Sequence, residues 1–264
     1  MCRIAAFPPG FSKSEAVKIL ANFENKNTDG TGSVYLKDGK FVVDKWAKPF
    51  SQIVKTKPNF LSHMPYSDSW TLVHLRAASH GGNSQQNTHP FLVGNWAFIH
   101  NGIWSEHNLV RLAISNQVTM TGETDSEVAA HFWNIVGPKK FAETVEFGGV
   151  FMGLHRNGKL WVAKTSGDLE IKALKHHRIV LASEFDHQVY EKTVDALKGW
   201  YQFSKDGCYV SHKENRSRWS SEYPYRGSAS SSGTAYESSF GGSGRSSDYI
   251  GNNQHTTCYG GCGD

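Results

Sequence analysis

The chain has 264 residues, of which 38% are hydrophobic and 20% are charged, and its formal net charge is +4. This size and balance are typical of one globular domain with an appendage. Lys and Arg are scattered rather than grouped, and no apolar stretch approaches the roughly 18 residues that span a bilayer, so we expect neither a nucleic-acid partner nor a membrane partner.

The first residues and the cysteines bear on the compartment. Only a four-residue apolar run precedes Pro8, which is too short for the core of a signal peptide. Cys2, Cys208, Cys258 and Cys262 are too few and too unevenly spaced to form a disulfide framework. We therefore expect a cytoplasmic protein.

Hydrophobic periodicity and turn residues predict a series of short elements along the chain. We expect, in order, a strand at 2–7, a helix at 14–25, a hairpin at 33–46, strands at 71–79 and 95–102, helices at 106–114 and 125–136, a hairpin at 149–164, a strand at 178–184 and a hairpin at 200–212. Ser12 and Glu15 form a capping-box pattern before the first helix. The three hairpins turn at Asp38-Gly39, Asn157-Gly158 and Asp206-Gly207, which are typical hairpin dipeptides.

This order of elements predicts the fold class and the domain limits. Strands occur in hairpins and helices lie between the hairpins, which favours an α+β domain with antiparallel sheets. We place this domain at 2–212. Residues 213–264 are rich in Ser and Gly and poor in aliphatic side chains, so we expect a flexible tail that cannot bury enough surface to fold.

Cys2 directly follows the initiator methionine, where removal of Met1 would give one residue both a thiol and a free α-amino group. That amino group has an ordinary pKa of about 8 and can act as a base near neutral pH. A cysteine thiol, with a pKa of about 8.5, can pass its proton to such a base at little cost. A small buried apolar residue in a strand is the other explanation of Cys2.

Three further positions carry groups that a thiol nucleophile requires. Asn101-Gly102 ends a strand and could supply side-chain and backbone N–H donors to an oxyanion, although such pairs also make ordinary turns. Arg76 could hold a carboxylate, or it could be only a surface strand residue. Asp125 could receive an ammonium group, or it could cap the following helix, as Thr124 also could.

Taken together and in order, these motifs resemble a known family. Cys2, RAASHG at 76–81, NTHPF at 87–91, HNGIW at 100–104 and GETDSE at 122–127 resemble the class II glutamine amidotransferases, which are N-terminal nucleophile (Ntn) hydrolases. The resemblance spans about residues 2–212. NTHPF, NWAFIHNG and GETDSE are especially similar to the compact stand-alone members, and HNGIW followed by EHN is also similar to the glucosamine-phosphate-synthase type.

The resemblance implies a fold and a role for each matching residue. The fold would be a four-layer αββα sandwich of two antiparallel sheets. Cys2 would attack the side-chain amide of glutamine, with its α-amino group as the base, and Asn101 and Gly102 would stabilise the oxyanion. Arg76 would hold the α-carboxylate of the substrate and Asp125 its α-ammonium. No cofactor and no metal ion would be needed.

Ser79 and His80 lie where the family has a loop that closes over the substrate, so we include both among the substrate-binding residues. Ala77 departs from the pattern, because many relatives carry an aromatic or bulky residue there. We interpret the departure as a more open substrate site.

Other chemically capable residues are given structural interpretations. His74, His89 and His100 lack the spacing of a metal site, and we interpret them as structural. Cys258 and Cys262, even with His255 nearby, fit solvated tail residues better than metal ligands.

The preferred hypothesis is a glutamine amidohydrolase or amidotransferase subunit that releases ammonia for a separate acceptor, such as an ATP-dependent ligase or an amidating synthase. A second hypothesis keeps the fold but takes a larger γ-glutamyl compound as the substrate. A third is a non-catalytic binding module that has kept the hydrolase fold.

Overall fold

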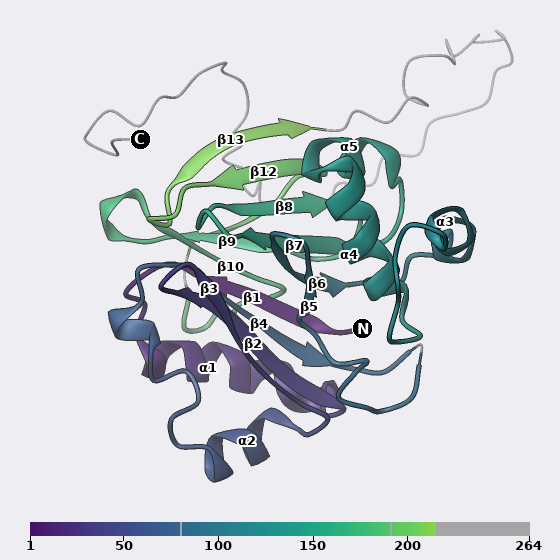
Figure 1. Ribbon diagram of the computed structural model, residues 1–264. Coiled ribbons are helices and arrows are strands. Elements are labelled where there is room, and N and C mark those ends of the chain that lie inside the picture. Colours follow the sequence, from purple (N-terminus) through teal and green to yellow (C-terminus); the bar gives the residue numbers. More distant parts are fainter. Residues whose placement is uncertain (80, 191, 215–264) are drawn as a thin grey trace, which may run out of the picture. The chain divides into compact units, whose positions relative to one another are not determined.

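The computed structural model describes residues 1–79, 81–190 and 192–214 (Figure 1). The expected tail at 213–264 therefore lies outside the described residues, apart from its first two positions, which end the last strand. The interpretation of His255, Cys258 and Cys262 lies outside them as well.

The described residues form two antiparallel sheets (Figure 1). The seven-stranded sheet has the order β11-β9-β10-β1-β4-β2-β3, and the six-stranded sheet has the order β13-β12-β8-β7-β6-β5. The first sheet contains β1 (Arg3–Phe7), β2 (Gly30–Lys37), β3 (Lys40–Trp46), β4 (Thr71–Arg76), β9 (Glu170–Ala173), β10 (Ile179–Ala182) and β11 (Thr193–Asp195). The second contains β5 (Phe91–Val93), β6 (Trp96–Asn101), β7 (Val150–His155), β8 (Leu160–Lys164), β12 (Gly199–Phe203) and β13 (Tyr209–Glu214).

Helices cover the outer face of each sheet. Helices α1 (Lys13–Phe23) and α2 (Phe50–Thr56) pack on the seven-stranded sheet, while α4 (Asp125–Val136) and α5 (Pro138–Thr144) pack on the six-stranded sheet. Helix α3 (His107–Ile114) packs on α4. Short 3₁₀ turns occupy Glu24–Lys26, Met64–Tyr66 and Lys175–His177. The predicted four-layer αββα sandwich of two antiparallel sheets is confirmed.

Three apolar clusters separate these four layers. The central cluster lies between the sheets, where Ile4, Leu72, Ile99 and Met152 come from four different strands and are fully buried. One outer cluster joins α1 and α2 to the first sheet, and another joins α4 and α5 to the second. Burial of apolar surface on both faces of each sheet is the main stabilisation of such a sandwich.

The predicted turns and caps have clear structural counterparts. Asp38 and Gly39 both have positive φ, as the tight turn between β2 and β3 requires. Ser12 caps α1 by accepting a hydrogen bond from the Glu15 backbone N–H. The helix predicted at 125–136 has the same limits in the structure. None of the described helices combines the length and the apolar content that crossing a membrane requires.

Five short elements are missing from the sequence prediction: α2, α5, β5, β9 and β11. Each has between three and seven residues. Such lengths are too short to display a full helical or alternating pattern, so tertiary packing rather than local sequence determines these elements.

Candidate functional site

Cys2 lies immediately before β1, a central strand of the seven-stranded sheet. In the antiparallel pairing of β1 with β4, Arg3 lies opposite Leu75, so one further step along the register places Cys2 beside Arg76. The half-buried Cys2 thiol donates a hydrogen bond to the Ala77 carbonyl, with an Sγ–O distance of 3.5 Å.

Three charged groups act on the pKa of the Cys2 thiol. Burial raises the pKa of the Cys2 thiol, while the Ala77 hydrogen bond, the terminal amino group and the Arg76 guanidinium lower this pKa in part. The Asp125 carboxylate acts in the raising direction. Because burial dominates, the resting thiol is protonated at neutral pH and requires a base before it can attack.

Arg76 ends β4 and is only 3% exposed, which excludes the interpretation as a surface strand residue. Its guanidinium donates to the carbonyls of Gly82 and Gly81, at 3.1 and 3.3 Å. The segment after β4 thus curls back over its own arginine. Asp29 also secures this segment, since its carboxylate accepts from the Ala78 N–H at 2.8 Å.

Asn101 ends β6, which packs across the sandwich from β1 and β4. Its side-chain Nδ2 donates to Ser183 Oγ at 3.2 Å, and its Oδ1 is buried without a hydrogen-bond partner among the described residues. At Gly102, any side chain would collide with the Gly148 carbonyl, so only glycine fits. The Asn101-Gly102 pair is therefore a tightly packed corner rather than an ordinary exposed turn.

Ser183 is a site residue that sequence reasoning missed. Its hydroxyl accepts from the Ile4 N–H at 2.9 Å and donates to the Ile4 carbonyl at 3.3 Å, while it also receives the Asn101 amide. One buried hydroxyl thus ties the end of β6 to the strand that follows Cys2. A serine after a short strand gives no signal of this role in the sequence.

Asp125 is the first residue of α4, and Thr124 rather than Asp125 is the N-cap. The Thr124 hydroxyl accepts a hydrogen bond from the Glu127 N–H at 3.2 Å, so the Asp125 carboxylate is not needed to cap the helix. One of its oxygens, Oδ2, accepts from the Trp104 N–H at 2.8 Å. The side chain is 4% exposed, and its charge acts on the Cys2 thiol.

The remaining two predicted site residues are Ser79 and His80. Ser79 is exposed and has no hydrogen bond to the described residues. His80 lies outside the described residues. The structure therefore brings together Cys2, Arg76 and Asp125, with Asn101 and Gly102 at the facing strand end.

A cluster of buried histidines lies beside these residues. His74 and His89 stack with a ring-centroid distance of 3.8 Å, and His74 Nε2 donates to the His100 carbonyl at 3.1 Å. Burial lowers the pKa of all three histidines, that of His74 to about 3. Within the described part of the chain, no group of three or more His, Cys, Asp or Glu side chains is arranged to hold a metal ion.

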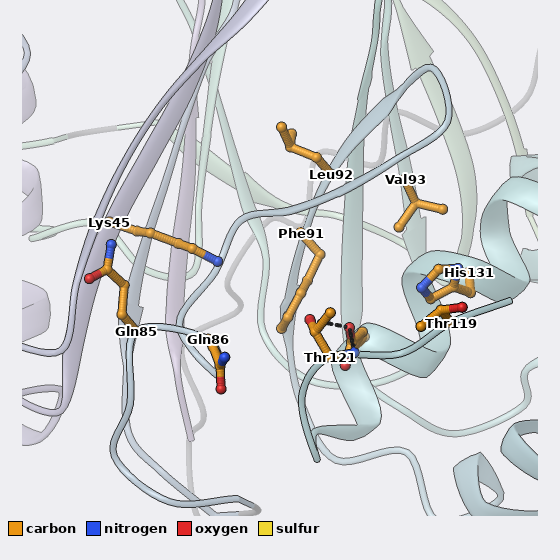
Figure 2. A pocket seen from close by; sticks show the side chains of 10 residues that line it. Lys45, Gln85, Gln86, Phe91, Leu92, Val93, Thr119, Thr121 and His131 are labelled. Atoms are coloured by element: carbon orange, nitrogen blue, oxygen red, sulfur yellow. Dashed lines mark hydrogen bonds between the residues drawn. The ribbon is translucent and has the colours of Figure 1, made fainter.

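A pocket of about 490 Å³ is lined by residues of β3, β5 and α4 and by the loops that contain Gln85 and Thr121 (Figure 2). Figure 2 shows Lys45 reaching in from one wall, with Thr121 and His131 on the opposite wall. The Lys45 ammonium donates to the Thr88 and Pro90 carbonyls at 3.1 and 3.5 Å. The Glu127 carboxylate accepts from the Thr121 hydroxyl and from the N–H groups of 121 and 122. Both charged groups thus hold the two loops that flank the candidate site.

Comparison with known proteins identifies a matching family. Residues 16–136 match the family model described as "Glutamine amidotransferases class-II". This segment contains Arg76, Asn101, Gly102 and Asp125, and it begins after Cys2. Over 112 residues, 38% of the chain, the sequence is 30% identical to a glutamine–fructose-6-phosphate aminotransferase of Vibrio cholerae. The match covers 18% of that protein, so the chain spans less than a fifth of this relative.

Solved structures share the fold. A glutamine phosphoribosylpyrophosphate amidotransferase from B. subtilis superposes on 81% of this chain and 49% of its own, with a TM-score of 0.61 and 17% identity. A glutamine aminotransferase class-II domain protein from Silicibacter pomeroyi covers 81% of this chain and 99% of its own, with a TM-score of 0.52 and 14% identity. The architecture is thus preserved at identities where little sequence similarity remains.

The buried histidines predict a loss of stability in acid. The unfolded chain binds a proton at each histidine near pH 6.5, whereas folded His74 stays neutral down to about pH 3. Stability is therefore full above about pH 6.5 and falls as the pH drops toward 3, by up to about 1.4 kcal/mol per pH unit for each such histidine. Urea unfolding between pH 7.5 and 4 measures this slope.

The variant His74→Asn should reduce the slope by about one proton. Equal slopes in wild type and His74→Asn would contradict the assignment of a neutral buried His74.

Proposed function

We propose, from the premise that this chain belongs to the class II glutamine amidotransferases, that it hydrolyses the side-chain amide of glutamine through a thioester on Cys2. The observation that carries the proposal is the convergence of Arg76 and Asp125 on the Cys2 thiol. One nucleophile flanked by one cation and one anion suits a zwitterionic substrate with a reactive side chain.

The proposed reaction begins with removal of Met1, because an amide nitrogen at Cys2 cannot accept a proton. The freed α-amino group takes the thiol proton as Sγ forms a bond to the side-chain carbon of glutamine. The resulting ammonium then protonates the leaving nitrogen as the carbon–nitrogen bond breaks. Ammonia departs and a γ-glutamyl thioester remains on Cys2.

Water completes the turnover. The same amino group takes a proton from water as the oxygen attacks the thioester carbon, and the carbon–sulfur bond breaks to regenerate the thiol. Glutamine and water thus become glutamate and ammonia. In both halves of the reaction, negative charge develops on the former amide oxygen, where the Asn101 side chain and the Gly102 N–H would donate. One such donor is typically worth about 3 kcal/mol in the transition state.

The proposed recognition uses both ends of the amino acid. The Arg76 guanidinium would bind the α-carboxylate, and its buried position would strengthen this pairing. The Asp125 carboxylate would bind the α-ammonium through Oδ1, since Oδ2 is already occupied by Trp104. A site that binds both charged groups would exclude most other carboxamides as substrates.

We expect the glutamine analogue diazo-oxo-norleucine to label the protein once, on Cys2, and we expect the labelled protein to lack Met1. The Cys2→Ala variant should show no label and should lose glutamine hydrolysis by roughly 10⁴-fold or more. Intact-mass analysis followed by peptide mapping measures both results.

Cys208 gives a matched control for this experiment, because it is a buried cysteine in the described part of the chain. The Cys208→Ala variant should keep both the label and the activity. Retention of Met1 in active protein, or labelling at a residue other than Cys2, would overturn the mechanism.

A second candidate substrate, a larger γ-glutamyl amide, is favoured by Ala77. This small, half-buried residue presents its carbonyl to the Cys2 thiol, and its own side chain is only a methyl group. The glutamyl part would bind as glutamine does, and the larger leaving amine would occupy the space beside Ala77.

Replacing Ala77 by Phe tests this alternative. If the physiological substrate is a larger amide, wild type should turn over γ-glutamyl dipeptides more efficiently than glutamine, and Ala77→Phe should lower dipeptide turnover about tenfold while sparing glutamine. Coupled glutamate assays on both substrates measure the ratio. A wild-type preference for glutamine that Ala77→Phe leaves unchanged would reject the larger substrate.

We further propose that the ammonia passes to a separate amidating enzyme. The support is the relation to longer proteins whose names describe transfer of the glutamine nitrogen to an acceptor. Affinity capture from the native host, using the Cys2→Ala protein as bait, should recover an ATP-dependent ligase or an amidating synthase. Recovery of neither from cells that contain the protein would count against this partner.

A further inference from the structure

A continuous chain of buried hydrogen bonds runs beneath the candidate site, from β4 through β6 to α4. His74 on β4 donates to the His100 carbonyl on β6. The His100 ring then reaches the Gly148 carbonyl through Nε2 at 2.7 Å and the Ser126 hydroxyl through Nδ1 at 2.9 Å. Ser126 Oγ also lies 3.3 Å from Asp125 Oδ1. The path ends at the carboxylate to which we assign the substrate ammonium.

The partners of the His100 ring determine where its proton lies. A carbonyl oxygen only accepts hydrogen bonds, so the short contact with Gly148 requires a proton on Nε2. In a neutral imidazole the other nitrogen is then an acceptor. Nδ1 must therefore receive a hydrogen from Ser126, and the Ser126 hydroxyl has one hydrogen to give.

The environment of His100 keeps the ring neutral and in place. Burial lowers the pKa of His100 below its ordinary value, and the opposing effect of the Asp125 carboxylate does not cancel this. His100 is 1% exposed as a whole residue. Its ring stacks on Phe151, with a centroid distance of 4.3 Å and an interplanar angle of 6°. Its orientation toward Gly148 and Ser126 is fixed by these contacts.

The single Ser126 hydrogen has two competing acceptors, His100 Nδ1 and Asp125 Oδ1. The contact with Nδ1 is 0.4 Å shorter, from the two distances 2.9 and 3.3 Å. While the Ser126 hydroxyl donates its hydrogen bond to Nδ1 rather than to Asp125, Asp125 Oδ1 receives no hydrogen bond from any described residue. Its full negative charge then faces the site, where it can bind an incoming cation.

We propose that His100 is a positioning residue for substrate recognition, because it holds the Ser126 hydrogen and so keeps Asp125 Oδ1 available for the substrate's α-ammonium. This inference rests on the proposed function, since it concerns the residue that reads the amino end of glutamine. Without the imidazole acceptor, Ser126 turns its hydrogen to Oδ1 and competes with the substrate for that oxygen.

The competition predicts a particular kinetic pattern. The α-ammonium is bound to the same extent before and during the reaction, so weakening its site raises KM with little change in kcat. We expect His100→Phe, whose ring can still stack on Phe151, to raise the KM for glutamine about tenfold and to change kcat by less than about threefold. Ser126→Ala alone should leave KM within about threefold of wild type, because no hydroxyl then competes for Oδ1.

The double variant His100→Phe/Ser126→Ala gives the decisive comparison. Removing the hydroxyl from the His100→Phe background should bring KM back toward the wild-type value, a strongly non-additive result for two neighbouring residues. A purely structural role for the two residues predicts the opposite, a double variant at least as impaired as the worse single variant.

A substrate analogue supplies an independent readout. Glutaramate is glutamine without the α-amino group, so it makes no use of Asp125. The His100→Phe variant should hydrolyse glutaramate with the wild-type KM, although its KM for glutamine is raised. Equal increases for both substrates would overturn the proposal, as would a double variant no better than His100→Phe.

The experiment also separates this inference from the proposed function. Failure of wild-type protein to hydrolyse glutamine would reject the function itself, whereas an active wild type with no recovery in the double variant would reject only the role of His100. Thermal unfolding identifies variants that do not fold. If His100→Phe is among them, His100→Gln takes its place, because its amide N–H can donate to Gly148 while it has no acceptor at the Nδ1 position.

Discussion

A hydrogen bond between the His74 ring and the His100 carbonyl joins the two sheets at the point where the candidate site begins. The central cluster between the sheets is apolar, so a polar group beside it is costly unless it is paired. This bond therefore favours one alignment of β4 against β6. Arg76 lies two residues beyond His74 and Asn101 directly follows His100, so the same alignment determines where both of them lie.

Two further residues position the site by hydrogen bonding to the backbone of the segments that carry it. Ser183 connects Asn101 to the strand that follows Cys2, and Asp29 secures the segment after Arg76. Neither residue faces a substrate in the proposed reaction. Both fix the positions of groups that do, which matters because catalytic groups lose efficiency when they are displaced by as little as about 1 Å.

The sequence predicts the fold well where local chemistry determines structure. Asx-Gly pairs locate the hairpins, and the caps at Ser12 and Thr124 locate two helices, because these signals act within a few residues. Helix α5 and strands β9 and β11 are missed because packing against distant elements, rather than their own pattern, stabilises them.

The same distinction applies to the candidate site. Arg76, Asn101, Gly102 and Asp125 stand in short recognisable motifs. In the structure, Arg76 and Asp125 act on the Cys2 thiol, and Asn101 is linked through Ser183 to the strand that follows Cys2. Ser183, Asp29 and Gly148 contribute through contacts between segments far apart in the sequence, and no local pattern reveals such contacts. Ser79 is predicted from its position in a motif, yet its side chain is exposed.

The backbone contact at Gly102 has a consequence for how this protein can diversify. Gly102 lies against Gly148 and Gly149, and a methyl group on either Gly102 or Gly149 would strike the backbone of the other segment. Single substitutions at this corner are therefore closed to natural drift and to laboratory selection alike. We therefore expect changes of substrate preference to arise at other positions around the site, where a new side chain does not strike a backbone atom.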